Sequence, residues 1–322
     1  MTNLLILSAG TRNKVVEYCR EAMHGEGIVV ATDCSPYAPA IYEADACEIV
    51  PRIDAPDYMQ TIFEIVKKYD IRGCFSLIDP ELSLIAKHAD ELRELGCEPM
   101  ISPYDLVETC LHKARCAELF KKHGLATAKY YLHPTEFDMD HAQEGVDFPV
   151  FVKPEGGSAS LDIHVAENHR ELDVLFAKQD GLMIQEFMNG QEYGADVYVD
   201  MISGKCAAIF LKKKLKMRAG ETDKAVSVHD QALFDLIVPF VEAAGFRGEI
   251  DIDLFKDGDK WYFSEVNPRF GGGYPHAYAC GVDVPSMLLR NLRGEANPPA
   301  AFDYEDGVVM MKYNEVMIRR EA

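Results

Sequence analysis

The sequence has little of what a secreted or membrane protein needs. Its nine cysteines are dispersed, odd in number and without a Cys-x-x-Cys pair, which argues for reduced thiols in a cytosol rather than for a disulfide framework. No apolar run is long enough to cross a bilayer, and residues 1–7 have neither the basic leader nor the apolar length of a signal peptide. We therefore expect a soluble, cytoplasmic protein that makes no contact with a membrane.

Positive charge is also scarce. The chain has 33 lysines and arginines against 53 aspartates and glutamates, a net charge of -20. A field of this sign repels nucleic acid, so we expect no nucleic-acid partner, and a polyanionic ligand would need a local basic pocket. With 322 residues, 48% of them apolar, the chain can form more than one core, and two or three domains are expected.

The first hundred residues alternate between buried-strand runs and helical patterns. Such alternation predicts a doubly wound parallel sheet. The strands are expected at 4–7, 28–31 and 74–78, and the helices at 13–23, 57–69 and 80–96.

The turn after the first strand, Ser8 to Asn13, is not Gly-x-Gly-x-x-Gly. A nicotinamide enzyme is therefore a minor alternative, although Asp33 ends the second strand where a ribose ligand could lie. Substrate binding at the carboxyl ends of the strands is the better use of such a sheet. Asp79 and Glu81, which open the helix after the third strand, are candidate substrate ligands; helix capping by Asp79 is the alternative.

The remaining chain is richer in β-structure. A helix is expected at 106–123, which carries Lys113, and others at 170–177 and 231–244. Strands are expected at 148–154, 162–165 and 183–188, as hairpins at 195–201 with 205–211 and at 248–255 with 260–266, and at 308–313.

Hard oxygen ligands gather on the hairpin at 248–266. Glu265 and Asn267 are two residues apart on a strand and face the same way, and Asp253 on the neighbouring strand can converge on the same point. Mg²⁺ prefers such oxygens, with phosphates filling its other sites. Arg269 would project from the same side, and Asp251 is a weaker candidate ligand. The alternative is an exposed hairpin with scattered charges.

Two lysines and a glycine-rich segment could bind a polyphosphate. Lys113 and Lys153 would supply positive charge, and Lys153 stands between apolar strand residues where it needs an anionic partner. Gly156 to Ser160 offers unhindered backbone N–H groups and two hydroxyls. The alternatives are a solvated Lys113 and an ordinary turn.

A single basic run, Lys212 to Arg218, interrupts the acidic chain. It could line the entrance for phosphate or substrate, with Arg218 as the preferred member. A solvated hairpin face is the favoured interpretation for most of its lysines.

The ordered series of these motifs resembles the ATP-grasp superfamily over nearly the whole chain, and within it the single-chain proteins similar to the synthetase units of the carbamoyl-phosphate synthase large subunit. The series is Lys113, Val152-Lys153-Pro154, Gly156-Gly157-Ser158-Ala159-Ser160, Gln185-Glu186-Phe187-Met188 with Glu192, Asp253, and Glu265-Val266-Asn267-Pro268-Arg269. The resemblance implies a Rossmann-like pre-ATP-grasp domain at 1–108 and two α+β subdomains, at 109–184 with a phosphate lid at 155–160 and at 185–322 with the metal site.

The resemblance also assigns roles. Adenine would stack on the hinge Gln185 to Met188, and Glu192 would bond the ribose, unless it is a capping or surface carboxylate. One or two Mg²⁺ ions, which Mn²⁺ could replace, would bind Asp253, Glu265 and Asn267. The catalytic residues would be Arg269, on the forming acyl phosphate, and Arg218. The ATP-binding set would be Lys113, Lys153, Gly156, Gly157, Ser158, Ser160, Gln185, Glu186, Phe187, Met188 and Glu192, and the substrate set Asp79, Glu81, Gly272, Gly273 and His276.

One departure bears on the substrate. Biotin carboxylases follow the corresponding arginine with a Gln-x-Glu-His-type segment, whereas here Arg269 precedes Phe270-Gly271-Gly272-Gly273-Tyr274-Pro275-His276. The carboxylate expected to act on bicarbonate is absent, which disfavours a carboxylase. A single synthetase-like unit likewise disfavours carbamoyl-phosphate synthesis.

The sequence therefore predicts an ATP-dependent ligase that joins a small-molecule carboxylate to an amine, or to a thiol, through an acyl phosphate and releases ADP and phosphate. The resemblance implies dipeptides or amino acid conjugates as the products. The alternatives are an ATP-binding sensor or accessory subunit without catalysis, and an enzyme that phosphorylates bicarbonate. A homodimer is one expected assembly, because homodimers are common among the proteins it resembles.

Overall fold

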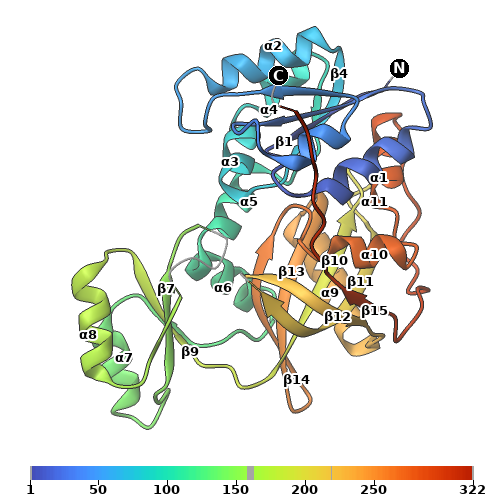
Figure 1. The fold of residues 1–322 in the computed structure, drawn as a ribbon. Helices are drawn as coiled ribbons and strands as arrows, with labels where there is room; N and C mark the ends of the chain where they lie inside the picture. Colours follow the sequence, from blue (N-terminus) through green and yellow to red (C-terminus); the bar gives the residue numbers. More distant parts are fainter. Residues whose placement is uncertain (1, 158–162, 219, 321–322) are drawn as a thin grey trace.

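The computed structural model describes residues 2–157, 163–218 and 220–320, and it contains three β-sheets (Figure 1). The N-terminal sheet is parallel, in the order β3-β2-β1-β4-β5. Its strands are β1 (Asn3–Leu7), β2 (Val29–Asp33), β3 (Ala46–Ile49), β4 (Ile71–Ser76) and β5 (Glu98–Pro99). The helices between them are α1 (Asn13–Met23), η1 (Pro39–Glu43), α2 (Tyr58–Lys68), α3 (Asp79–Lys87) and α4 (Ala89–Glu94). The predicted doubly wound sheet is confirmed.

Side-chain alternation along β1 explains the two covered faces of this sheet. Leu4 and Ile6 pack with Val15 and Val16 of α1, whereas Leu5 and Leu7 belong to the cluster that holds the apolar side chains of α2 and α3. The single helix predicted at 80–96 is wrong, because the backbone leaves the helical region at His88 and separates α3 from α4.

Between the N-terminal sheet and the second sheet lie α5 (Tyr104–Leu111) and α6 (Lys113–Lys122), where one helix was predicted. The helix breaks at His112, whose backbone is extended and forms a bridge with Gly156. The N–H of Lys113 also donates to the carbonyl of Glu155 at 2.9 Å. The break therefore fixes the start of α6 to the glycine-rich segment.

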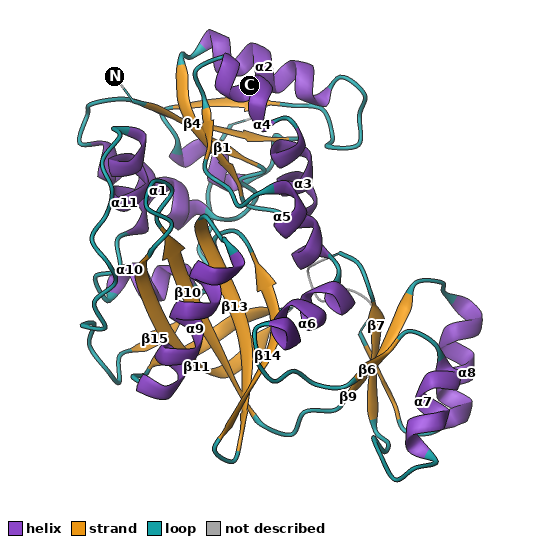
Figure 2. Ribbon diagram, turned by 180° about the vertical axis from the view of Figure 1, so that it is seen from behind, coloured by secondary structure: helices purple, strands orange, loops and turns teal. Residues whose placement is uncertain are grey.

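The second sheet is small and lies to one side of the molecule, with α7 and α8 on its outer face (Figure 2). Its strand order is β6-β9-β7-β8. The elements are β6 (Tyr130–Tyr131), α7 (Pro134–His141), β7 (Val150–Pro154), β8 (His164–Ala166), α8 (His169–Lys178) and β9 (Leu182–Glu186). Phe137 of α7, Leu172 of α8 and Val150 and Val152 of β7 form its core.

The third sheet is antiparallel, in the order β14-β13-β10-β11-β12-β15. Its strands are β10 (Gln191–Val199), β11 (Cys206–Arg218), β12 (Glu221–Ser227), β13 (Gly248–Asp257), β14 (Lys260–Asn267) and β15 (Val309–Met311). The helices of this region are α9 (Gln231–Ala244), α10 (Tyr274–Ala279) and α11 (Val284–Leu292).

The two faces of the third sheet differ sharply in polarity. Ala195, Val197, Ile250 and Ile252 belong to the same buried cluster as the apolar side chains of α9. The residues that alternate with them in sequence are charged, and they gather on the opposite face: Glu192, Asp196, Lys212, Lys214, Glu249, Asp251 and Asp253. Strand periodicity therefore separates a hydrophobic core from a face built for polar chemistry.

One hydrophobic cluster joins the first and last parts of the chain. Leu4 and Ile6 of β1 share it with Phe210 of β11, Tyr274 of α10 and Leu288 of α11. The N-terminal sheet is thus held against the third sheet, while the domain boundaries at 108 and 184 stay predictions. None of the helices within the described residues combines the length and the apolar character needed to span a bilayer.

Candidate active site

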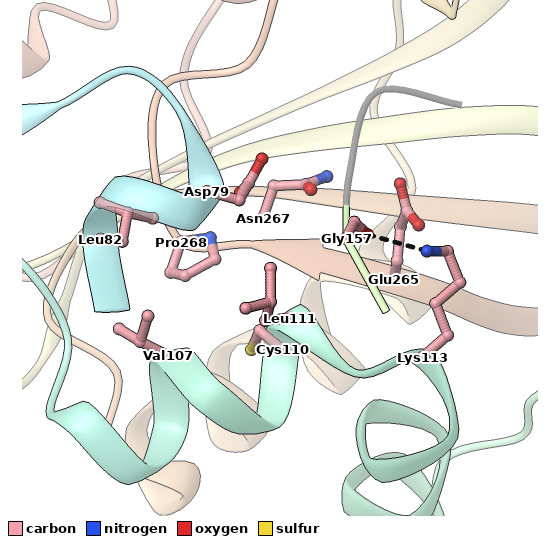
Figure 3. A pocket seen from close by; sticks show the side chains of 10 residues that line it. All are labelled: Asp79, Leu82, Val107, Cys110, Leu111, Lys113, Gly157, Glu265, Asn267 and Pro268. Atoms are coloured by element: carbon pink, nitrogen blue, oxygen red, sulfur yellow. Dashed lines mark hydrogen bonds between the residues drawn. The ribbon is translucent and has the colours of Figure 1, made fainter. Parts of the chain in front are cut away.

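A pocket lies where the first helix after β4, the α5–α6 junction and the end of β14 meet (Figure 3). Its lining combines the apolar side chains of α3 and α5 with polar groups from the predicted site. The lining residues are Asp79, Leu82, Val107, Cys110, Leu111, Lys113, Gly157, Glu265, Asn267 and Pro268. Segments far apart in sequence therefore form one site.

The predicted metal ligands are neighbours. In the register of β13 and β14, Asp253 lies opposite Glu265 and Asp251 opposite Asn267. Figure 3 draws one hydrogen bond between the described residues that line the pocket, from Lys113 to Gly157. The side-chain oxygens of Glu265 and Asn267 therefore form no hydrogen bond with another lining residue. Asn267 is only 9% exposed, and a buried amide needs a polar partner.

These oxygens fit a hard divalent cation. The described residues contain no cluster of three or more His, Cys, Asp or Glu side chains suited to a metal, so a cation here would have two carboxylates and an amide, with phosphate or water completing its shell. Asp253 also accepts from Lys214 at 2.5 Å. Burial, with the Asp253 carboxylate beside it, raises the pKa of Asp251 to about 7, which makes Asp251 the weaker anionic ligand.

The two predicted phosphate lysines lie near the same carboxylates. Burial and the positive charge of Lys113 lower the pKa of Lys153, and the carboxylates of Glu265 and Asp253 oppose that shift. Lys113 donates to the carbonyl of Gly157 at 2.8 Å. Gly156 and Gly157 belong to the lid predicted at 155–160. The other predicted lid residues, Ser158, Ala159 and Ser160, lie outside the described residues.

The predicted adenine hinge follows the small sheet. Gln185 is buried on β9, Glu186 ends the strand, and the ring of Phe187 stacks on Phe151 with centroids 4.6 Å apart. The Glu186 carboxylate accepts from the N–H of Lys129 at 3.0 Å. Main-chain groups of the hinge are therefore left to form hydrogen bonds with the adenine base. Met188 lies in the following loop, and strand 183–188 is shorter than predicted.

Glu192 pairs with Lys214 at 2.8 Å, so the predicted ribose ligand is connected through that lysine to Asp253, a predicted metal ligand. The same lysine bridges Glu192 and Asp253, and together these carboxylates raise the pKa of Lys214 although burial acts the other way. The prediction of a solvated face is wrong for two lysines of the basic run, since Lys212 and Lys214 are buried and ion-paired.

Arg218 lies apart from this cluster. Its side chain is 53% exposed and pairs with Asp223 at 3.3 Å on the adjacent strand. The described structure does not bring it to the pocket of Figure 3, so its catalytic role stays a prediction.

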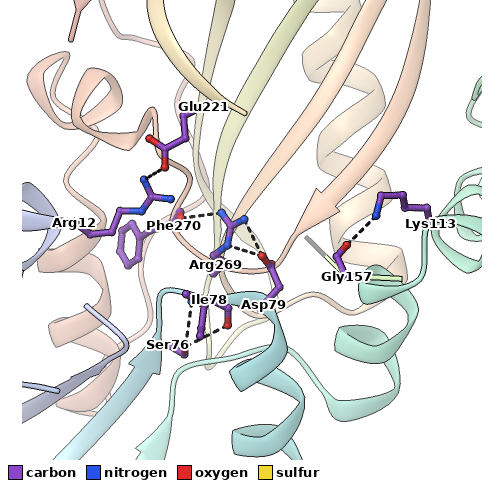
Figure 4. A network of polar contacts seen from close by, with 9 residues as sticks. All are labelled: Arg12, Ser76, Ile78, Asp79, Lys113, Gly157, Glu221, Arg269 and Phe270. Carbon is purple, nitrogen blue, oxygen red and sulfur yellow. Dashed lines mark hydrogen bonds and ion pairs between the residues drawn. The ribbon is translucent and has the colours of Figure 1, made fainter. Parts of the chain in front are cut away.

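Arg269 is held by Asp79. Its Nε and Nη2 donate to the same oxygen of Asp79 at 3.0 and 2.9 Å, and its Nη1 donates to the carbonyl of Phe270 (Figure 4). Burial lowers the pKa of Arg269, but the carboxylates of Asp79 and Asp251 more than offset it. Asp79 makes no side-chain cap on α3 and positions the guanidinium. Because it also lines the pocket, its predicted contact with substrate stays a prediction.

Glu81 does not reach the pocket. It is fully buried and accepts hydrogen bonds from the hydroxyls of Tyr58 and Ser76. Glu81 is not among the residues that line the pocket, and its predicted contact with substrate stays a prediction.

Glu81→Gln should remove one pH-dependent cost to stability. Burial raises the pKa of Glu81 above its ordinary 4.5, so this group favours folding most below pH 4.5 and less as the pH rises toward its folded-state value. Glutamine carries no charge to bury. The free energy of unfolding, measured in guanidinium chloride at about pH 5 and about pH 8, should fall less between these two pH values in the variant than in wild type. Glu94→Gln, at an exposed position, is the control and should behave as wild type. If the free energy of unfolding fell equally in Glu81→Gln and in wild type, this account would be contradicted.

The glycines after Arg269 allow close packing. A Cβ on Gly273 would lie 2.9 Å from Nζ of Lys212, and one on Gly272 would lie 2.9 Å from Nη1 of Arg12. His276 is buried and donates from Nε2 to the carbonyl of Val308 at 2.9 Å. Burial lowers the pKa of His276 and so favours its neutral form. Its predicted contact with substrate stays a prediction.

The sequence analysis missed Arg12, and it did not predict that Lys212 and Lys214 are buried and ion-paired. The two lysines had a signal, because they alternate on a strand that continues from the apolar Ile209 to Leu211. Arg12 follows β1 as an ordinary turn residue, and nothing local in the sequence marks its partner Glu221.

Comparison with known proteins agrees with this architecture. The PylC-like N-terminal domain family matches residues 4–100, and the family described as ATP-grasp in the biosynthetic pathway with Ter operon matches residues 178–316. The predicted resemblance to the ATP-grasp superfamily is confirmed by the match over residues 178–316. The narrower likeness to carbamoyl-phosphate synthase stays a prediction.

Two curated relatives and one solved structure illustrate what this chain is similar to. A D-alanine–D-alanine ligase from Lacticaseibacillus casei is 26% identical over 208 residues, which cover 58% of this chain and 57% of the relative. A formate-dependent phosphoribosylglycinamide formyltransferase from Solidesulfovibrio magneticus is 28% identical, with 83% of this chain and 69% of the relative covered. The chain spans a little over half the length of the first relative.

The solved structure is the biotin carboxylase domain dimer of 2-oxoglutarate carboxylase from Hydrogenobacter thermophilus, in complex with MgADP, ADP and bicarbonate. It superposes with a TM-score of 0.76 at 16% identity, covering 95% of this chain and 73% of that one. At this identity the likeness shows the shared fold.

Proposed function

We propose that this ATP-grasp chain is an ATP-dependent carboxylate–amine ligase that works through an acyl phosphate and acts on small molecules. The observation that carries the proposal is the convergence of Glu265, Asn267 and Lys113 on one pocket, with Arg269 fixed by Asp79 at its edge. The D-alanine–D-alanine ligase among its relatives supports this reaction class.

In this proposal some residues supply charge and others fix the orientation of the reacting groups. Lys113 and Lys153 bring positive charge to a chain whose overall field repels a triphosphate. Mg²⁺, or Mn²⁺ in its place, would be held by Asp253, Glu265 and Asn267 and would neutralise phosphate charge. Arg269, locked in orientation by Asp79, would hold the oxygens of the acyl phosphate as they form.

The reaction balances as two displacements. A carboxylate oxygen of the substrate attacks the γ-phosphorus of ATP, and the bond to ADP breaks. The amine then attacks the acyl carbon, phosphate leaves, and the amine loses a proton to solvent. Holding the reactants together contributes through effective molarity, on the order of 10⁵ M in favourable cases.

Purified protein with Mg-ATP, pooled carboxylates and pooled amines should release ADP and phosphate, measured by chromatography of the nucleotides and a phosphate assay. Release of AMP and pyrophosphate would overturn the acyl-phosphate route. Bicarbonate as sole acid tests the carboxylase alternative, and tight ATP binding without turnover under every condition would favour a sensor or accessory subunit.

Two further proposals concern the setting of the protein. The dispersed cysteines, all free within the described residues, support a cytoplasmic location. The 2-oxoglutarate carboxylase domain is described as a dimer, and we extend a homodimer to this chain as a proposal that light scattering would test.

A further inference from the structure

A second cavity lies at the opposite end of the N-terminal sheet from the candidate active site. Thr2 precedes β1, Arg72 lies at the start of β4 and Glu98 begins β5, whereas Asp79 of the candidate active site follows the carboxyl end of β4. The cavity has a volume of about 720 Å³, within the usual range for a small-molecule site. Its other lining residues are Arg93, Gly96, Cys97, Met100, Met201, Ile202, Asn291, Leu292 and Gly294. The described lining residues of the two cavities do not overlap, so a ligand in one leaves the other accessible.

The walls of this cavity come from both ends of the chain. The N-terminal sheet supplies one wall, and the loop after β10 supplies the other together with the end of α11. The end of α11 packs closely on β4, because a Cβ on Gly73 would lie 2.5 Å from Cδ1 of Leu292. The cavity therefore lies where the N-terminal sheet meets the C-terminal region.

Two buried polar side chains hold the loop after β10 in shape. Asp200 accepts hydrogen bonds from the N–H groups of Ile202 and Ser203 at 3.1 and 2.7 Å. Asn291 accepts from the N–H of Met201 at 3.0 Å and donates to Asp200 at 2.6 Å. This wall of the cavity is therefore preformed, which lowers the entropic cost of binding a ligand.

Much of the lining is apolar. Cys97 and Met100 are buried. Met201 and Leu292 are partly buried against the core cluster of the N-terminal sheet, and Ile202 is half exposed. A ligand with an apolar body would cover these side chains and remove them from water, which favours its binding.

Arg72 brings an available guanidinium group to the cavity. Its side chain is 48% exposed and lies over Gly96, where a Cβ would be 3.0 Å from Nη1. Asp70 is the acceptor that the described residues provide for Arg72, through Nη2 at 3.0 Å, so Nε and Nη1 remain available to an anion. The pair with Asp70 is exposed and contributes little to stability, so an anion can also displace Asp70.

The carboxylate in the described lining is already paired. Glu98 accepts from Nε and Nη2 of Arg93 at 3.1 Å each, and Nη1 of Arg93 donates to Asp90 at 3.1 Å. Arg93 therefore offsets the charge of Glu98, and Arg72 is the group that binds an anion directly. A cationic ligand would meet two guanidinium groups and one neutralised carboxylate, so the lining selects against it.

We propose that this cavity is a second ligand site, separate from the candidate active site, for a small organic anion. Its apolar body would lie against Met100 and Leu292, and its carboxylate or phosphate group would bind Arg72. A guanidinium group pairs with either kind of headgroup, whereas the apolar lining excludes a bare inorganic anion. The inference is independent of the proposed reaction, because it uses none of the residues that line the pocket of Figure 3.

Four octyl compounds test this ligand class by calorimetry. Octanoate and octyl phosphate carry the two possible headgroups, 1-octanol has the same tail without charge, and octylammonium has the opposite charge. At least one of the two anions should bind with a Kd of about 1 mM or tighter, and the alcohol and the ammonium compound at least about tenfold more weakly. Equal binding of 1-octanol, or no binding of either anion up to about 10 mM, would overturn the proposal.

Two variants locate the binding. Arg72→Gln should weaken the anion about tenfold to a hundredfold and abolish its preference over 1-octanol. Ile202→Trp puts a larger side chain at a half-exposed position of the lining and should abolish the binding of all four compounds. Arg293→Gln is the matched control, because Arg293 forms a similar exposed ion pair with Glu26 and does not line the cavity. Its affinity for the anion should stay within about twofold of wild type.

Circular dichroism melting curves should show that both variants remain folded, and either variant alone decides the location if the other does not fold. Unchanged affinity for the anion in both variants, or an equal loss in Arg293→Gln, would place the binding elsewhere and overturn this site. Because the readout is binding without nucleotide, a negative result leaves the proposed ligase reaction untouched.

Discussion

Glu265→Gln is expected to lower the rate of ADP formation by about 10²- to 10³-fold while the protein remains folded. Glu265 lies opposite Asp253 on the hairpin and projects into the pocket beside Lys113. Glutamine keeps the size of the side chain but removes the negative charge that a divalent cation needs. Nucleotide chromatography measures the rate, and the Mg²⁺ concentration required for half-maximal turnover should rise in the variant.

Glu94→Gln serves as the matched control, because Glu94 is exposed on α4 and is not among the pocket residues. Circular dichroism melting curves of both variants should overlay that of wild type, which separates loss of chemistry from loss of fold. Wild-type turnover and wild-type Mg²⁺ dependence in Glu265→Gln would remove this carboxylate from the metal site.

The N-terminal sheet could be predicted from sequence because buried parallel strands are continuous apolar runs, as in Leu4 to Leu7. Two strands of the same sheet were missed for physical reasons. β3 lies at the sheet edge and alternates between half-buried and exposed positions, the exposed ones being Cys47 and Ile49, and β5 has only two residues. Neither gives a hydrophobic pattern long enough to recognise.

The facing positions of the predicted metal ligands on the β13–β14 hairpin were also predictable, because a strand period of two fixes which side chains share a face. Asp253 opposite Glu265 is confirmed by the register. The ion pairs between the N-terminal and C-terminal parts of the chain were not predictable. Arg269 and Asp79 are 190 residues apart, and Arg12 and Glu221 are 209 apart. Such contacts depend on how the N-terminal sheet docks on the third sheet, and no local pattern carries that information.

The basic run shows how composition can mislead. Seven residues with five positive charges in an acidic chain favour a solvated face, yet Lys212 and Lys214 point to the inner side of a central strand. They are buried there because carboxylates from β10 and β13 meet them. Strand alternation, rather than the number of charges, decided which lysines went inside.

Lys212→Met should lower the free energy of unfolding by about 3–5 kcal/mol, because it leaves buried negative charge without its cationic partner. Nζ of Lys212 lies 2.5 Å from Asp196, and the two side chains are 1% and 0% exposed. Asp251 lies 3.9 Å from the same ammonium group, and Glu249 is buried nearby with both carboxylate oxygens lacking partners among the described residues. Unfolding in guanidinium chloride, followed by circular dichroism, measures this loss of unfolding free energy.

Lys216→Met removes the same charge from an exposed position of the same strand and should change stability by less than about 0.5 kcal/mol. The double variant Asp196→Leu with Lys212→Met tests the cause. Removing both partners should restore part of the lost stability, and the restoration is incomplete because Asp251 still lacks the nearby ammonium group. If the two single losses simply added, the ion pair would not be the source of the effect, and the loss in Lys212→Met would have to come from packing of the long side chain.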